Sequence, residues 1–142
     1  MTARARGWSF AQWALAVISL LHVAQAVVGF IAEPSFATGP DAPTAVVLGM
    51  DYNGWHAAAG LLLFAPGLYF ATRRPWAVAY LLLAGVWALF SHQVAWVFTF
   101  PNNMTDAVVH FVTGGLMVLI AAIQIRLDGG WRASLGELLD PR

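Results

Sequence analysis

The sequence of 142 residues contains no cysteine and no lysine. Without cysteine, the chain has no disulfide, no thiolate metal site and no redox-active thiol. Seven lysines and arginines, all of them arginine, balance seven acidic residues, so the formal net charge is zero. A chain without an excess of positive charge lacks the electrostatic signature of nucleic-acid binding. We therefore expect no nucleic-acid partner.

Charged residues of either sign are also scarce. They make up 10 % of the chain, whereas hydrophobic residues make up 60 %. A water-soluble domain of this size needs more polar residues to cover its surface. The sequence therefore predicts an integral membrane protein that is surrounded by a lipid bilayer.

Four long apolar runs occur, over about residues 8–32, 53–72, 75–98 and 105–125. Each run is long enough, as a helix, to cross a hydrocarbon core of about 30 Å. The predicted fold is all-α, a four-helix transmembrane bundle that forms a single transmembrane domain over residues 1–142. Residues 126–142 form a tail that is either a short interfacial helix or disordered. The apolar patch at 45–48 is expected to lie on the membrane surface or to cap the bundle.

The arginines predict the orientation of this bundle. All seven fall on one side of a four-crossing topology: Arg4, Arg6, Arg73, Arg74, Arg126, Arg132 and Arg142. By the positive-inside rule, both termini and the turn between the second and third helices are cytoplasmic. The turn is short, so these two helices are expected to be antiparallel neighbours. The expected location is the cell (plasma) membrane, as a multi-pass protein.

The first apolar run has some features of a secretory signal. Two arginines precede it, and Ala24-Gln25-Ala26 resembles a cleavage site. However, the run continues to Ile31, which makes it long enough to anchor the chain. We expect the first helix to be retained.

Each of the four apolar runs carries one histidine, and the chain has no others: His22, His56, His92 and His110. Counted from the outer helix ends, they lie about 5–15 Å below the outer membrane boundary. Ionisable groups in a membrane turn toward the interior of a helix bundle. The sequence therefore predicts that the four histidines line a pocket that opens to the outside and bind a cofactor there.

Other polar and small residues share helix faces with these histidines. Asn53 precedes His56 by three residues, Gln25 follows His22 by three, and Thr113 follows His110 by three. These three residues are expected to extend the polar pocket. Glycines on the same faces, such as Gly60, Gly67, Gly85 and Gly114, are expected to let the helices pack closely.

Imidazole groups make a metal or haem site one interpretation of this pocket. Neutral imidazole suits zinc, copper and iron, and two facing histidines can bind a haem iron axially. The predicted metal ligands are His56, His110 and Asp106. Asp106, one turn before His110, is expected to accept a proton from the second ring nitrogen of that histidine. Purely structural roles and a proton-handling network are the alternatives, because polar side chains also specify helix packing in membranes.

The phrases MDYNGWHAAAGLLL and TDAVVHFVTGGLMVLIA, with the four-run layout, resemble the uncharacterised bacterial membrane family DUF4383. The matching positions are Asn53, His56, Gly60, Asp106, His110 and Gly114, and the resemblance extends over about residues 8–125. It implies a small four-span protein of the bacterial inner membrane. It implies nothing about activity, because the function of that family is itself unknown.

Two functional interpretations remain open. In the first, the protein is a small membrane protein of unknown activity whose pocket binds a metal, haem or small ligand. In the alternative, it is an accessory or scaffold subunit of a larger membrane complex, and its histidines are purely structural. A homo-oligomer is compatible with either. No nucleophile and base, phosphate loop or carboxylate pair is recognisable, so an enzyme has little support.

Overall fold

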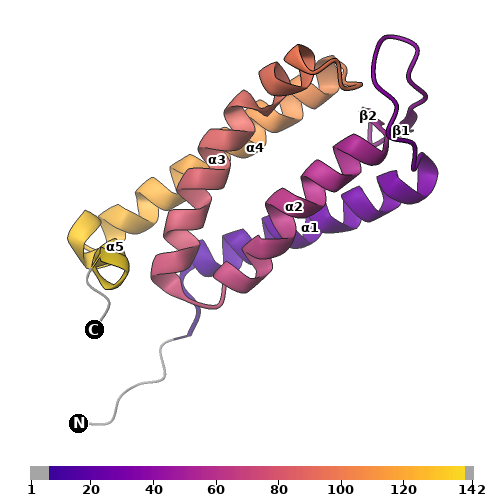
Figure 1. Cartoon of the computed structure of the whole chain (residues 1–142). Helices are drawn as coiled ribbons and strands as arrows, with labels where there is room; N and C mark the ends of the chain where they lie inside the picture. The colour runs from indigo at the N-terminus through magenta and orange to yellow at the C-terminus, as the bar shows by residue number, and fades with distance from the viewer. Residues whose placement is uncertain (1–6, 140–142) are drawn as a thin grey trace.

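The computed structural model describes residues 7–139, which form five helices and one hairpin of two strands (Figure 1). The elements in chain order are α1 (Phe10–Ala32), β1 (Ala45–Val47), β2 (Met50–Tyr52), α2 (Gly54–Phe70), α3 (Arg74–Val97), α4 (Met104–Leu127) and α5 (Trp131–Leu139). Each apolar run of the sequence contains one long helix, and its ends lie within two residues of the expected ones. The sequence does not predict the β-hairpin. Because the hairpin is present, the described chain is mostly helical rather than all-α.

Of the helices in the described part of the chain, three are long and apolar enough to cross a membrane: α1, α3 and α4. Large apolar side chains cover their outer surfaces, such as Leu21, Leu83 and Phe111, which are 63 %, 73 % and 68 % exposed. Surfaces of this kind are stable in hydrocarbon rather than in water, which indicates a membrane protein. Helix α2 is also apolar, but its 17 residues extend over about 26 Å only.

Polar side chains cap the first turns of α1, α2 and α4. At the start of α1, the Ser9 hydroxyl accepts from the backbone N–H of Gln12, whose side chain accepts from the N–H of Ser9. Asn103 and Asp106 form the same reciprocal box at the start of α4. The Asn53 side chain caps α2. These bonds satisfy backbone donors that have no partner within the helix, and they fix where each helix begins.

The long helices pack as two pairs. Helix α1 contacts α2, and α3 contacts α4, far more extensively than any other helices contact each other (Figure 1). We call α1 and α2 the first pair, and α3 and α4 the second pair. Although a short turn joins α2 to α3, these two helices contact each other much less, because a cavity lies between them along part of their length.

Glycines allow the close approach within each pair. A Cβ atom added to Gly114 of α4 would lie 2.7 Å from the carbonyl oxygen of Gly85 in α3. A Cβ atom added to Gly67 of α2 would clash with the hydroxyl of Ser19 in α1. Small residues are therefore needed at both crossings, as the shared helix faces predict.

The two ends of the bundle differ. The arginine end, which contains the turn at Arg73 and Arg74, is filled by an apolar core of residues from all four long helices, including Leu15, Phe64, Leu81 and Met117. The opposite end, which we call the hairpin end, carries β1 and β2. There the buried side chains of the hairpin pack on Ala57 of α2 in a separate small cluster. The main core therefore lies away from the hairpin end, and the cavity lies between the core and the hairpin end.

Polar side chains join the helices at the arginine end. The Gln124 side chain accepts from the backbone N–H of Ala11 at 3.2 Å and donates to the Asp128 carboxylate at 2.7 Å. Asp128 also forms an ion pair with Arg74 and accepts from the hydroxyl of Ser134 in α5. Of the two alternatives for the tail, the structure therefore has the short helix, which is held against the ends of α3 and α4.

The hairpin end is closed by a tight turn. Strands β1 and β2 are antiparallel, with Val47 opposite Met50, and only Leu48 and Gly49 connect them. Both connecting residues have positive φ, 52° and 84°, which is the pattern of a type I′ turn. Leu48 is 81 % exposed at the tip. The hairpin caps the bundle, which is one of the two positions expected for the apolar patch.

Candidate functional site

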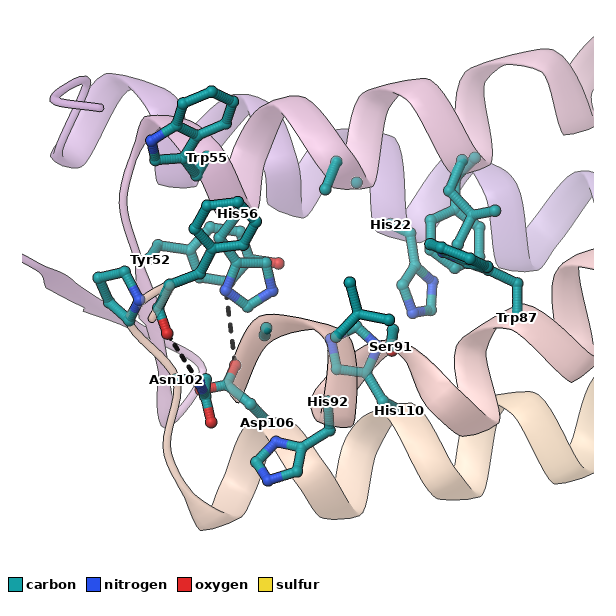
Figure 2. Close-up of a pocket in the computed structure, with 18 residues that line it drawn as sticks. His22, Tyr52, Trp55, His56, Trp87, Ser91, His92, Asn102, Asp106 and His110 are labelled. Atoms are coloured by element: carbon teal, nitrogen blue, oxygen red, sulfur yellow. Dashed lines mark hydrogen bonds and ion pairs between the residues drawn. The ribbon is translucent and has the colours of Figure 1, made fainter. Parts of the chain in front are cut away.

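A cavity of about 190 Å³ lies between the first pair and the second pair, toward the hairpin end (Figure 2). Its walls come from α1, β2, α2, α3, α4 and the link between α3 and α4. All four histidines line it. The full lining is His22, Tyr52, Trp55, His56, Ala59, Gly60, Leu63, Phe64, Trp87, Ser91, His92, Val94, Ala95, Phe100, Pro101, Asn102, Asp106 and His110.

His56 is fixed by the cap of α2. Its Nδ1 atom lies 2.7 Å from the carbonyl oxygen of Asp51. A carbonyl oxygen can only accept, so Nδ1 carries a proton and donates this bond, and in the neutral form of the ring Nε2 is the acceptor. The ring of Tyr52 stacks on the imidazole, with centres 4.0 Å apart and planes 7° apart. His56 is therefore held in one orientation and in one tautomer.

Asp106 is the one acidic residue in the lining, and its side chain is 1 % exposed. Its Oδ2 atom accepts from the backbone N–H of Asn103 at 2.7 Å and from that of Asp51 at 3.2 Å. Its Oδ1 atom is buried, lies 3.6 Å from Nδ1 of His56 and accepts no hydrogen bond from any described residue. The carboxylate is thus only half satisfied by the protein.

The sequence predicts that Asp106 pairs with His110, one turn farther along α4, but the carboxylate is directed toward His56 instead. Figure 2 shows the Asp106 side chain reaching across to α2. The physical reason is the capping box, since the bond to the N–H of Asn103 turns the carboxylate back toward the start of α4. There it meets β2 and the first turn of α2.

The other three histidines are placed by different contacts. His22 donates from Nδ1 to the carbonyl oxygen of Ile18 at 2.9 Å and stacks on Phe64 at 4.0 Å, so its Nε2 atom is also an acceptor. The ring centres of His110 and His56 are 5.7 Å apart. His92 has a buried Nδ1 atom that bonds to nothing within residues 7–139.

Three residues expected in the polar pocket do not line the cavity. Asn53 is fully buried as the cap of α2 and also donates to the carbonyl oxygen of Ala37. Gln25 donates to the sulfur of Met50 at 3.9 Å. Thr113 is half-buried on α4. Among the described residues that surround the cavity, none of these three appears.

Aromatic residues form much of the wall, and they are not among the residues predicted to line the pocket. They are Tyr52, Trp55, Phe64, Trp87 and Phe100. Helical spacing places Gly60 and Phe64 on the face of His56, so that part of the wall was accessible to prediction. Burial, together with the nearby charge of Asp106, raises the pKa of the Tyr52 phenol. This ring therefore stays neutral in the physiological range.

A second pocket lies next to the cavity at the hairpin end. Its lining includes Asp51 and shares Phe100, Pro101 and Asn102 with the cavity. A hydrogen bond from the N–H of Gly39 to the carbonyl oxygen of Thr99, at 2.9 Å, joins two of its walls. We call this second pocket the vestibule. Only the shared segment 100–102 belongs to both linings.

The cavity contains the carboxyl group of Asp106 but no fixed positive charge. Of the arginines that the structure describes, none lines the cavity or the vestibule, because they lie at the arginine end of the bundle and in α5. Within residues 7–139, no three histidine or acidic side chains are grouped closely enough to hold a metal ion. The arrangement therefore offers hydrogen-bond acceptors next to aromatic surfaces.

Comparison with known families gives one match. The family model described as "Domain of unknown function (DUF4383)" matches residues 12–123. No curated protein and no solved structure matches the chain. The match extends over all residues of the cavity.

Proposed function

This chain belongs to the DUF4383 family, and we propose that it is a small membrane protein that binds a small ligand between its two helical pairs. The single observation that supports this most is the unsatisfied polar atoms of the cavity. Asp106 Oδ1 and His92 Nδ1 are buried and lack a hydrogen-bond partner among the residues that the structure describes. Buried polar atoms are rarely left without a hydrogen bond, so a ligand in the cavity supplies what the protein does not.

The proposal includes a fourth membrane crossing by α2. Helix α2 lies beside α1, which is long and apolar enough to span a membrane, and Leu62 on α2 is 77 % exposed. The shorter length of α2 is compensated by β2 and the turn at Arg73, which extend it at both ends. With four crossings, the arginine end faces the cytoplasm and the vestibule opens outside a plasma membrane.

The size of the cavity limits the ligand. A volume of about 190 Å³ is below the range of about 300–1,000 Å³ typical of sites for drug-sized molecules. Haem is larger than this cavity and does not fit between the two pairs. The proposal is therefore a ligand of a few heavy atoms, held by imidazole and carboxylate groups.

The alternative is a scaffold subunit with structural histidines. The observation in its favour is that His22 and His56 both bond to backbone carbonyl groups, as histidines do when they only fix the packing. This alternative explains the two bonded nitrogens. It does not explain the unpartnered atoms of Asp106 and His92.

Native mass spectrometry of the protein, purified in mild detergent from its own membrane, separates these functions. We expect a ligand of low mass at one copy per chain in the wild type and its loss in His56→Ala and His92→Ala. The matched control is Gln93→Ala, because Gln93 is exposed and neighbours His92. A ligand-free protein that retains a partner protein, with the same result for all variants, contradicts the proposal and supports the scaffold subunit.

A further inference from the structure

We propose that the ligand of this cavity is a small protonated amine, an inference that rests on the proposed function and specifies its ligand class. The cavity combines three properties that such a cation requires. It offers acceptors for N–H groups, it contains the carboxyl group of Asp106 without any arginine, and it has aromatic walls.

Several hydrogen-bonding groups around the cavity are acceptors. His22 and His56 each donate from Nδ1 to a backbone carbonyl, so each leaves an Nε2 lone pair. The Asn102 side chain donates to the carbonyl oxygen of Phe100, which leaves its amide oxygen free to accept. With Asp106 Oδ1, this gives acceptors from four separate segments. A ligand that satisfies them must carry several hydrogen-bond donors.

The charged residues around the two pockets favour a positively charged ligand. The buried carboxylate of Asp106 has been removed from water, and a charge in that position needs a positive partner. Asp51 lines the vestibule next to the cavity. No arginine described in the structure lines either pocket. A cationic ligand supplies the fixed positive charge that the lining lacks, next to the pair formed by Asp106 and His56, whose Oδ1 and Nδ1 atoms are 3.6 Å apart.

The aromatic walls favour an organic cation over a bare metal ion. Trp87 and Phe64 line the cavity near His22, as Figure 2 shows for Trp87. Aromatic faces attract ammonium groups through their quadrupoles and also contact alkyl carbons. In contrast, the part of the chain that the structure describes groups no three metal-binding side chains. An alkylammonium ion of a few carbons uses both the acceptors and the apolar wall.

The vestibule provides a path for such a cation. Its wall shares Phe100, Pro101 and Asn102 with the cavity, so this segment is the partition between them. Asp51 contacts both sides. It lines the vestibule, while its backbone N–H donates to Asp106 and its carbonyl oxygen accepts from His56. A cation attracted to Asp51 is therefore brought to the partition next to the final acceptors.

The test is calorimetric titration of the full chain in lipid nanodiscs with three probes. n-Propylammonium has charge and N–H donors, 1-propanol is its neutral analogue, and tetramethylammonium has charge without N–H donors. We expect n-propylammonium to bind at one per chain and the other two at least about tenfold more weakly, because hydrogen bonds to charged groups are the strong ones. If 1-propanol or tetramethylammonium binds as tightly as n-propylammonium, the proposal of a protonated amine is wrong.

Substitutions in the lining test which residues bind n-propylammonium. Asp106→Asn keeps an oxygen for the cap of α4 but removes the charge, and we expect it to weaken n-propylammonium at least about tenfold. Trp87→Leu is a second variant, at a half-exposed position that perturbs folding less, and we expect about a threefold loss. Asp41→Asn is the control, because Asp41 is exposed in the loop between α1 and β1 and lines neither pocket. Unchanged affinity in Asp106→Asn, or in Trp87→Leu where the first variant does not fold, overturns the proposal.

The two proposals fail in different ways. A neutral or anionic molecule found in the cavity of the native protein overturns the amine and leaves ligand binding intact. A protein that carries no native ligand and binds none of the three probes overturns both.

Discussion

The backbones of Gly85 and Gly114 lie in direct contact where α3 crosses α4. A Cβ atom added to Gly114 would lie 2.7 Å from the carbonyl oxygen of Gly85 and 2.9 Å from the backbone nitrogen of Leu89. Backbone atoms cannot move aside as flexible side chains do. The second pair therefore depends on the absence of a side chain at this point.

Gly114→Ala is expected to lower the free energy of unfolding by about 1–3 kcal/mol, the usual cost of overpacking a tight contact. Thermal unfolding in detergent measures it. Gly115→Ala is the matched control, because a Cβ there meets no described atom within 4 Å. Equal stability of the two variants contradicts the close crossing of α3 and α4.

Gly67→Ala is expected to destabilise the first pair in the same way, by about 1–3 kcal/mol. The clash is with the hydroxyl of Ser19, which is buried and has no hydrogen-bond partner within the described residues. Ser19→Ala alone is therefore expected to change stability little, and the double variant to recover much of the loss. A double-mutant cycle by thermal unfolding measures the coupling. Additive effects of the two substitutions argue against the contact.

Leu48→Asn is expected to stabilise the hairpin by about 1 kcal/mol, because asparagine tolerates the left-handed conformation that leucine adopts at this turn. Hydrogen exchange of the amides of β1 and β2 measures it. Val46→Asn is the control, since Val46 is also exposed but lies in β1, and no gain is expected there. Faster exchange in Leu48→Asn contradicts the turn type.

Single cysteines test the proposed topology, and the absence of native cysteine makes the labelling unambiguous. We expect Thr38→Cys, in the loop before β1, to react with a membrane-impermeant maleimide applied to intact cells. Thr72→Cys, before Arg73, is expected to react only after the membrane is opened. Both positions are exposed in the protein, so accessibility to water is matched. The reverse pattern of labelling would show the opposite orientation. Labelling of both cysteines in intact cells would show that both lie on the outer side.

The long helices follow from the sequence because hydrophobic runs and capping residues are local signals. Ser9, Asn53 and Asn103 begin helices for reasons contained within a few neighbouring residues. The hairpin lacks such a signal. Its turn places leucine in a conformation that leucine rarely adopts, so no turn propensity identifies Leu48.

The candidate site was predictable in part. One histidine in each apolar run predicts their approach to one another, because polar groups avoid lipid. The partner of Asp106 was not predictable, since its position one turn from His110 on α4 is a local relationship and its actual neighbour, His56, belongs to another helix. The aromatic residue Phe100 was also missed, because it lies in the link between α3 and α4, where periodicity carries no information.

The division into two pairs has a consequence for biogenesis. The first pair is complete once α2 has emerged from the ribosome, and its crossing at Gly67 and Ser19 needs nothing that is synthesised later. The cavity, in contrast, takes its walls from both pairs. It therefore arises only when the second pair docks on the first pair. Under the proposed function, ligand binding therefore requires that both pairs have assembled.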